Sequence, residues 1–345
     1  MLPHSPISLK IVIRVLFLSL LSSVFLFPGI VSADEDVPAT HKAIVQQVYD
    51  EVFNAGKLDL MDEIYASDYL NHGFGDDLTL EDFKSTITAM QAALPDFEAT
   101  VEVLIAQDNQ VASRVLFSGT FENAWVMGDQ TIEPNGETIT WSLNILHKFN
   151  DEDQIVEDYT AFDTLGLLTQ LDAAPLPKFI AEILTSPEHT PIVMEESTAT
   201  EADLQIHQEA FMHIMDDAIN NGELTAIDTY MAEDHQAHEP FGDFTREQFK
   251  QVIAGFRATV PDLVVTVDDL VIEGDWLMAR LTYAGTFSNE ISAGLISIKP
   301  TNKPIKFIVN VFVHYNANGV SIEDFKEYNR LAWLRQLELI PPAAS

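Results

Sequence analysis

The chain has 345 residues, with 54 acidic and 18 basic side chains, so its formal net charge is −36. A chain this acidic repels phosphate backbones and anionic lipid, so we expect no nucleic-acid partner. It contains no cysteine, which excludes disulfides, thiol catalysis and thiolate metal sites. Its length is enough for two domains of ordinary size, and its 47% of hydrophobic residues predicts packed cores.

The first 33 residues have the features of a secretory signal peptide. Lys10 and Arg14 give it a positive start, the stretch 15–30 is largely apolar, and Val31-Ser32-Ala33 offers a small-residue cleavage site. An uncleaved membrane anchor is the alternative, but the apolar run is slightly short of the roughly 20 residues that a span needs. We therefore predict export to the periplasm or the exterior, with no membrane contact after cleavage.

The remainder of the chain is an internal repeat. Residues 41–171 align without a gap to residues 207–337, and landmarks such as Pro95-Asp96 and Pro261-Asp262 coincide. The segment 172–205 between the copies is rich in Pro, Thr and Glu, which is typical of a linker. We predict a first domain at 34–171, a linker at 172–205 and a second domain at 206–345.

Each copy has the same predicted order of elements. In the first copy, helical spacing covers 41–53 and 58–65, and a third helix begins at Thr79-Leu-Glu-Asp82 and stops before Pro95. The pattern then changes to strands at 98–105, 111–121, 138–149 and 155–162. Helices followed by an antiparallel meander indicate an α+β fold. A short helix is also predicted within the linker, at 178–184.

One strand of each copy is apolar on both faces. These strands are Phe307–His314 and its counterpart Trp141–His147. An antiparallel strand with one face in water would alternate apolar and polar residues, so both faces of these strands need cover. Helices can cover one face, and we predict that the two halves pack sheet against sheet as an intramolecular pseudo-dimer. A homo-oligomer is the alternative.

The chain resembles a known family at several places. They are Asn54-x-Gly56, His72, Pro95-Asp96, Gly119-Thr120 and above all the segment Ile155–Leu171, which ends Asp-x-Leu-Gly-Leu-Leu-x-Gln-Leu. This combination resembles the SnoaL-like polyketide cyclase, or ester cyclase, family of the NTF2-like superfamily, in tandem duplication. The resemblance implies two cone-shaped domains, each a curved antiparallel sheet wrapped by N-terminal helices around an apolar pocket.

The resemblance also implies a chemistry. The family's cyclases work without cofactor or metal, and an aspartate after the last strand serves as general acid and base. That aspartate corresponds to Asp163, and a pocket histidine corresponds to His72. Tyr159 stands where the family usually has Trp. The second copy has Asn329 at the aspartate position, which puts acid/base chemistry there in doubt.

Asp163 has two interpretations. By the strand period of two it shares a face with Tyr159, and a carboxylate at the mouth of an apolar pocket would have a raised pKa, suited to proton transfer. Alternatively, it caps the helical turn that begins at Thr164, a role that Asn329 could fill equally well. His72 and His238 are likewise either pocket residues or structural histidines.

Other polar positions complete the candidate site. Asn144 and Asn310 each interrupt an apolar strand and could bind substrate or bond across the sheets. We predict Asp163 and His72 as catalytic. The apolar stretch 125–127 is a pocket lid or simple packing. The spacing His235-x-x-His238-Glu239 is too weak to predict a metal site. The predicted substrate-binding residues are Tyr159, Asn144, Trp141, His238, Asn310 and Asn329.

Two functions remain open from the sequence. The first is cofactor-independent cyclase or isomerase chemistry on a small apolar carbonyl compound, carried by the first half. The second is a non-catalytic module that binds a small ligand or assists assembly, since folds of this kind also bind without reacting.

Overall fold

A computed structural model describes residues 37–73, 75, 77–128, 130–176, 189, 191–195, 197–293 and 296–340. The predicted signal peptide and the predicted helix at 178–184 lie outside the described residues. Among the described residues, no helix is both long and apolar enough to cross a membrane.

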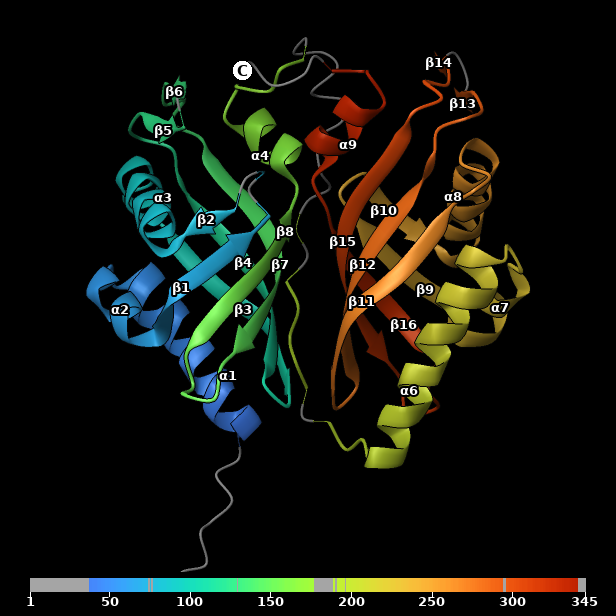
Figure 1. Ribbon diagram of the computed structural model, residues 1–345, viewed down its shortest axis with the longest axis horizontal. Helices are drawn as coiled ribbons and strands as arrows, with labels where there is room; N and C mark the ends of the chain where they lie inside the picture. Colours follow the sequence, from blue (N-terminus) through green and yellow to red (C-terminus); the bar gives the residue numbers. More distant parts are fainter. Residues whose placement is uncertain are drawn as a thin grey trace, which may run out of the picture. The chain divides into compact units, whose positions relative to one another are not determined.

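The two halves of the chain form two sheets of six strands with the same order (Figure 1). The first runs β2-β1-β8-β7-β4-β3 and the second runs β10-β9-β16-β15-β12-β11. This repetition confirms a duplicated α+β fold. The first sheet consists of β1 (Tyr65–His72), β2 (Leu78–Thr79), β3 (Glu98–Gln107), β4 (Gln110–Thr120), β7 (Thr138–Phe149) and β8 (Ile155–Phe162). The second consists of β9 (Met231–Glu239), β10 (Gly242–Thr245), β11 (Val264–Glu273), β12 (Trp276–Thr286), β15 (Pro304–Tyr315) and β16 (Ser321–Glu327).

Helices precede each sheet, and a small hairpin and a short helix complete each half. The third helix of each half begins with the predicted type of cap: the Thr79 side chain accepts from the Asp82 N–H while the Asp82 carboxylate accepts from the Thr79 N–H. Thr245 and Gln248 repeat this capping box. The helices are α1 (Val37–Gln47), α2 (Met61–Ile64), α3 (Leu80–Ala93), α4 (Thr164–Gln170), α6 (Glu201–His213), α7 (Thr225–Tyr230), α8 (Arg246–Thr259) and α9 (Arg330–Gln336); the hairpins are β5 (Trp125–Met127) with β6 (Gln130–Ile132) and β13 (Ile291–Ala293) with β14 (Ile296–Ile298).

The sequence prediction missed the short strands and, at the same place in each half, one long strand. The segment after the second helix, predicted as a loop, is strand β1 in the first half and β9 in the second. Each pairs in parallel with the last strand, so that His72 lies beside Tyr159 and His238 beside Phe325. Exposed polar residues and a register shift interrupt these strands, which removes the alternation that would have identified them.

The faces of the two sheets that the helices leave uncovered share one apolar cluster. The first half contributes residues of β3, β4 and β7, and the second contributes residues of β11, β12, β15 and β16. This cover explains why β7 and β15 carry apolar residues on both faces. The cluster consists of Val103, Ile105, Ala112, Leu146, Val271, Trp276, Met278, Phe312 and Phe325.

Two aligned asparagines make reciprocal hydrogen bonds across this contact. The Asn144 side-chain amide donates to the backbone carbonyls of Asn310 and Phe325, both at 2.9 Å. The Asn310 amide donates to the carbonyls of Asn144 and Tyr159, also at 2.9 Å. Both side chains are at most 1% exposed. Since buried carbonyl groups need donors, these bonds fix how the two sheets align.

Removing either amide should weaken the whole chain. We expect Asn144→Ala and Asn310→Ala each to lower the free energy of unfolding by on the order of 2 kcal/mol, because each leaves two buried carbonyls without a donor. Urea denaturation followed by circular dichroism measures this. The double variant should lose less than the sum, since the four bonds form one network. A loss below about 0.5 kcal/mol for both single variants would contradict the assignment.

Candidate functional site

Asp163 caps the short helix α4. Its Oδ2 accepts a hydrogen bond from the Gly166 N–H at 3.0 Å. Asn329 does the same in the second half, where its Oδ1 accepts from the Ala332 N–H at 2.9 Å. The two side chains therefore make the same capping contact, and the cap does not explain why one is an acid and the other an amide.

Asp163 also forms an ion pair with Arg330 of the second half. Arg330 is fully buried, and its guanidinium lies 4.9 Å from the centre of the Phe241 ring. The face of β8 that Asp163 shares with Tyr159 is turned toward the other half, since the Arg280 guanidinium lies 4.3 Å from the Tyr159 ring. The candidate catalytic carboxylate thus belongs to the contact between the halves.

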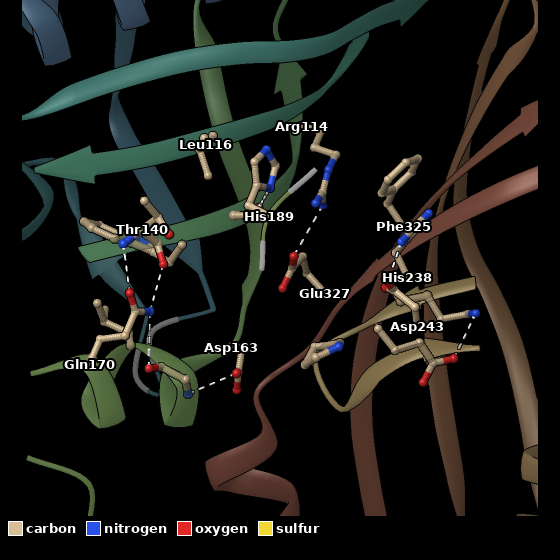
Figure 2. A pocket seen from close by; sticks show the side chains of 17 residues that line it. Arg114, Leu116, Thr140, Asp163, Gln170, His189, His238, Asp243, Phe325 and Glu327 are labelled. Carbon is tan, nitrogen blue, oxygen red and sulfur yellow. Dashed lines mark hydrogen bonds and ion pairs between the residues drawn. The ribbon is translucent and has the colours of Figure 1, made fainter. Parts of the chain in front are cut away.

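The surroundings of Asp163 form a polar cleft of about 100 Å³ between the halves (Figure 2). Arg114 reaches into it from β4 and donates to Asn144 Oδ1 at 2.9 Å, and it pairs with Glu327 Oε1 at 3.3 Å. His189 lies 2.6 Å from the Glu102 carboxylate. Asp163 therefore lies in polar surroundings and not at the mouth of an apolar pocket, as the sequence led us to expect.

Glu327 has an altered acidity within this cleft. The pKa of its carboxyl is raised to about 8: burial is the main cause and the negative charge of Asp163 adds to it, while the Arg114 and Arg330 guanidiniums oppose the rise. Loss of water thus destabilises the charged form of the carboxyl more than the nearby guanidiniums stabilise it. Glu327 is therefore largely protonated at neutral pH, and sequence inspection gave no signal of this because the aligned residue is Ala161.

The two candidate histidines occupy equivalent positions at the edges of the two sheets. His72 Nδ1 lies 2.7 Å from Asp77 Oδ1, and its ring stacks on Tyr159. His238 Nδ1 lies 2.8 Å from Asp243 Oδ1, and its ring stacks on Phe325. Of the two, His238 contributes to the lining of the cleft that contains Asp163, and the described lining does not include His72. The structure therefore does not bring Asp163 and His72 to one cavity.

The other predicted substrate-binding residues are engaged in packing contacts. Asn144 and Asn310 use their amide groups between the sheets, and Asn329 caps α9. Trp141 borders the cleft but also packs among Phe117 and Trp125 in the core of the first half, with ring centres 5.4 and 6.1 Å away. Each of these contacts gives its residue a structural role.

The second half contains a large apolar pocket between α8 and its sheet. Its volume is about 540 Å³, and eight of its nineteen lining residues are aromatic. Glu239 and Lys326 form an ion pair of 3.0 Å at this pocket and also border the polar cleft. The aromatic residues of the wall are Phe241, Phe244, Phe249, Phe256, Tyr283, Phe307, Tyr328 and Trp333.

One donor of the aromatic wall, the indole Nε1 of Trp333, is buried and has no hydrogen-bond partner within the described part of the chain. The wall also carries the hydroxyls of Tyr283 and Tyr328. Burial raises the pKa of both tyrosines above the usual value, so both hydroxyls keep their protons. Buried polar groups normally have partners, so the unpartnered indole is a polar contact that the protein leaves open. These donors are suited to acceptor atoms of a ligand.

Bulky side chains occupy the corresponding space in the first half. Trp125 stands at the position of Ile291, and Trp141 at that of Phe307. Both tryptophans are buried, and their ring centres lie 6.1 Å apart. Trp125 therefore packs into the core of its own half, in agreement with the packing interpretation of stretch 125–127. Comparing side-chain volumes between the copies could have revealed this difference.

The first half also contains a buried chain of polar groups that sequence analysis missed. Ser113 Oγ lies 2.9 Å from His147 Nε2, and His147 Nδ1 lies 2.7 Å from Asp158 Oδ1. Tyr69 donates to the other oxygen of Asp158 at 2.7 Å. The hydrogen-bonded series of serine, histidine and aspartate resembles the nucleophile, base and acid of a catalytic triad. However, Ser113, His147 and Asp158 are at most 2% exposed and border none of the described pockets. We interpret them as core hydrogen bonds.

The repeat preserves only the acid of this chain. Asp324, aligned with Asp158, bonds to His235 at 3.0 Å and to Lys326 at 2.6 Å. His235 is buried with Asp324 while His238 pairs with Asp243, so the two histidines of the His-x-x-His spacing bind different partners. No group of three or more His, Asp or Glu side chains within the described ranges could hold a metal ion. The identity of Asp158 and Asp324 was the signal available in the sequence.

The family comparison matches both halves of the chain. A model described as SnoaL-like polyketide cyclase matches residues 43–171 and 209–337, which together are more than half of the chain. No curated protein matches.

Solved structures are similar to one half at a time. One is a putative polyketide cyclase, IdmH from Streptomyces antibioticus, with 27% identity over 38% of this chain and 98% of that one, and a TM-score of 0.33. Another is AclR, a putative hydroxylase from Streptomyces galilaeus, with 22% identity over 40% and 98% and a TM-score of 0.35. A third is a putative SnoaL-like polyketide cyclase from Jannaschia sp. CCS1, with 17% identity over 41% and 96% and a TM-score of 0.36. At these TM-scores the similarities carry no argument about this chain.

The acidity of Glu327 predicts a pH-dependent stability. A carboxyl whose folded pKa is raised to about 8 stabilises the fold fully below its unfolded pKa, and this contribution is lost as pH rises through 8. Glu327→Gln keeps the hydrogen-bonding shape without ionising. We expect the variant to lose less stability than the wild type between pH 5 and pH 9 in thermal unfolding. Parallel curves for the two proteins would contradict the assignment.

Proposed function

Because the chain belongs to the SnoaL-like polyketide cyclase family, we propose that it binds a small, flat, apolar molecule with hydrogen-bond acceptors in the pocket of its second half. The observation that carries this proposal is the aromatic pocket of about 540 Å³, in whose wall the buried Trp333 Nε1 has no partner among the described residues and two tyrosine hydroxyls also occur. Ligand pockets are typically about 300–1,000 Å³ and mostly apolar, with a few polar groups. With the predicted signal peptide, we further propose that binding takes place after export.

The donors of the pocket indicate what the ligand carries. Tyr283 and Tyr328 keep their protons, and an indole N–H can only donate, so carbonyl or ether oxygens would complement all three groups. A purely apolar ligand would leave these groups without partners, at a cost of about 1–3 kcal/mol for each buried group. A site of this kind therefore selects ligands with acceptors.

The charges at the pocket favour an uncharged ligand. Lys326 is held between Glu239 at 3.0 Å and Asp324 at 2.6 Å, which keeps its pKa above the usual value and leaves no excess positive charge. The chain as a whole carries a formal charge of −36. Anionic ligands would be repelled over the whole surface without a compensating cation in the site.

Binding explains the geometry better than turnover by Asp163. Acid/base catalysis needs the carboxyl within hydrogen-bond reach of the reacting atom. Asp163 already accepts from Gly166 and Arg330 and borders the polar cleft rather than the apolar pocket. The proposal therefore follows the non-catalytic alternative and assigns ligand binding to the second half.

Exchanging the bulky residue of the hairpins tests where the ligand binds. The probe is prodan, an uncharged naphthyl ketone whose fluorescence responds to its surroundings. Ile291→Trp introduces the side chain that the first half has at this position, and we expect it to weaken prodan binding about tenfold or more, since overfilling costs about 1–3 kcal/mol. Trp125→Ile is the matched control and should leave the affinity of the second-half pocket unchanged.

The role of the donors is tested with the same probe. Tyr283→Phe and Tyr328→Phe should each weaken prodan binding by roughly 2- to 12-fold, the equivalent of one neutral hydrogen bond of about 0.5–1.5 kcal/mol. Binding of dimethylaminonaphthalene, which lacks the carbonyl, should not change. The proposal fails if prodan affinity survives Ile291→Trp, and a fall with Trp125→Ile would place the ligand in the first half instead.

A further inference from the structure

We infer that Asp163 of the first half is a positioning residue for the pocket of the second half, where it holds the Phe241 wall in place through Arg330. This inference rests on the proposed function, because it concerns the same pocket. It gives the carboxylate a role that neither acid/base chemistry nor helix capping supplies.

The first step is the ion pair between the halves. Arg330 is 0% exposed, and Asp163 Oδ2 is its anionic partner. A buried guanidinium that loses an anionic partner carries a large desolvation cost, so the position of the carboxylate constrains the position of the guanidinium. The residue of the first half aligned with Arg330 is Thr164. The symmetry-related position therefore has no ion pair between Asn329 and the first half.

The second step leads from Arg330 to the pocket. Its guanidinium carbon lies 4.9 Å from the centre of the Phe241 ring, a distance typical of cation–π contact. Phe241 lines the pocket and is 38% exposed. Packing within the second half therefore fixes the position of its ring only in part. Its ring centre lies 5.7 Å from that of Trp333 and 6.4 Å from that of Tyr328, which are two of the donor residues.

Both Phe241 and Arg330 are replaced by smaller, uncharged residues in the first half. The residue aligned with Phe241 is Gly75, and the residue aligned with Arg330 is Thr164. The half with the large pocket therefore has both the aromatic wall and the cation that holds it. The same relation explains the difference between Asp163 and Asn329: both cap a helix, but Arg330 faces Asp163, while Thr164 carries no charge for Asn329 to neutralise.

The test uses Asp163→Asn, which removes the charge and keeps the cap, as Asn329 demonstrates in the other half. We expect prodan to bind about 3- to 10-fold more weakly, because Arg330 loses the carboxylate that holds its guanidinium against the Phe241 ring. In a Phe241→Leu background the same substitution should have no further effect on affinity, because the residue through which it acts is gone.

Further variants separate positioning from general stability. Arg330→Lys keeps a charge opposite Asp163 without the planar face, and its affinity should fall like that of Asp163→Asn. Thr79→Ala removes the cap of α3 within the first half and so lowers stability without changing a residue of the contact between the halves, and its affinity should stay at the wild-type value. If Asp163→Asn does not fold, the double variant Asp163→Asn with Arg330→Gln removes both charges and replaces it in the same measurements.

The outcomes of the two proposals are distinguishable. If wild-type prodan binding does not respond to Ile291→Trp, the proposed function fails. If it does respond, but Asp163→Asn binds like the wild type or weakens binding equally with and without Phe241, this inference alone is overturned. A fall in melting temperature without any change in affinity would likewise assign Asp163 a purely structural role.

Discussion

The reciprocal hydrogen bonds of Asn144 and Asn310 are the constraint on which the arrangement of the two halves depends. Each amide satisfies two backbone carbonyls of the other half at 2.9 Å, within an apolar cluster to which both sheets contribute. A register other than this one would leave buried carbonyls without donors. Residues on the same sheet faces contact the opposite half, and so does Asp163 at the end of β8.

The two halves of the duplicated chain differ in their pocket and in the residue at the aspartate position. In the first half, Trp125 and Trp141 are buried where the second half has the smaller Ile291 and Phe307, which border its pocket. In the second half, the position of the family's aspartate is Asn329, yet the large apolar pocket is there. Pocket and carboxylate thus belong to different halves, and the buried contact between Asp163 and Arg330 joins them.

Local patterns predicted much of the fold but little of the site. The strands 138–149 and 155–162 and the cap at Thr79 follow from alternation and capping rules that act within a few residues. Strands β1 and β9 were not predicted, because polar residues interrupt the alternation that identifies a strand. The partner of Asp163 is on the other copy of the repeat, and the pocket depends on the summed volumes of side chains from several elements. Neither leaves a local pattern in the sequence.

The most direct measurement of where the ligand binds uses the isoleucine methyl groups. Ile253 lines the pocket of the second half, and the aligned Ile87 is buried in the first half, so the two form a matched pair of reporters. In a methyl-labelled protein titrated with prodan, NMR should show the Ile253 methyl signal shifting while the Ile87 signal stays in place. A shift of Ile87 with Ile253 unchanged would place the ligand in the first half and contradict the account.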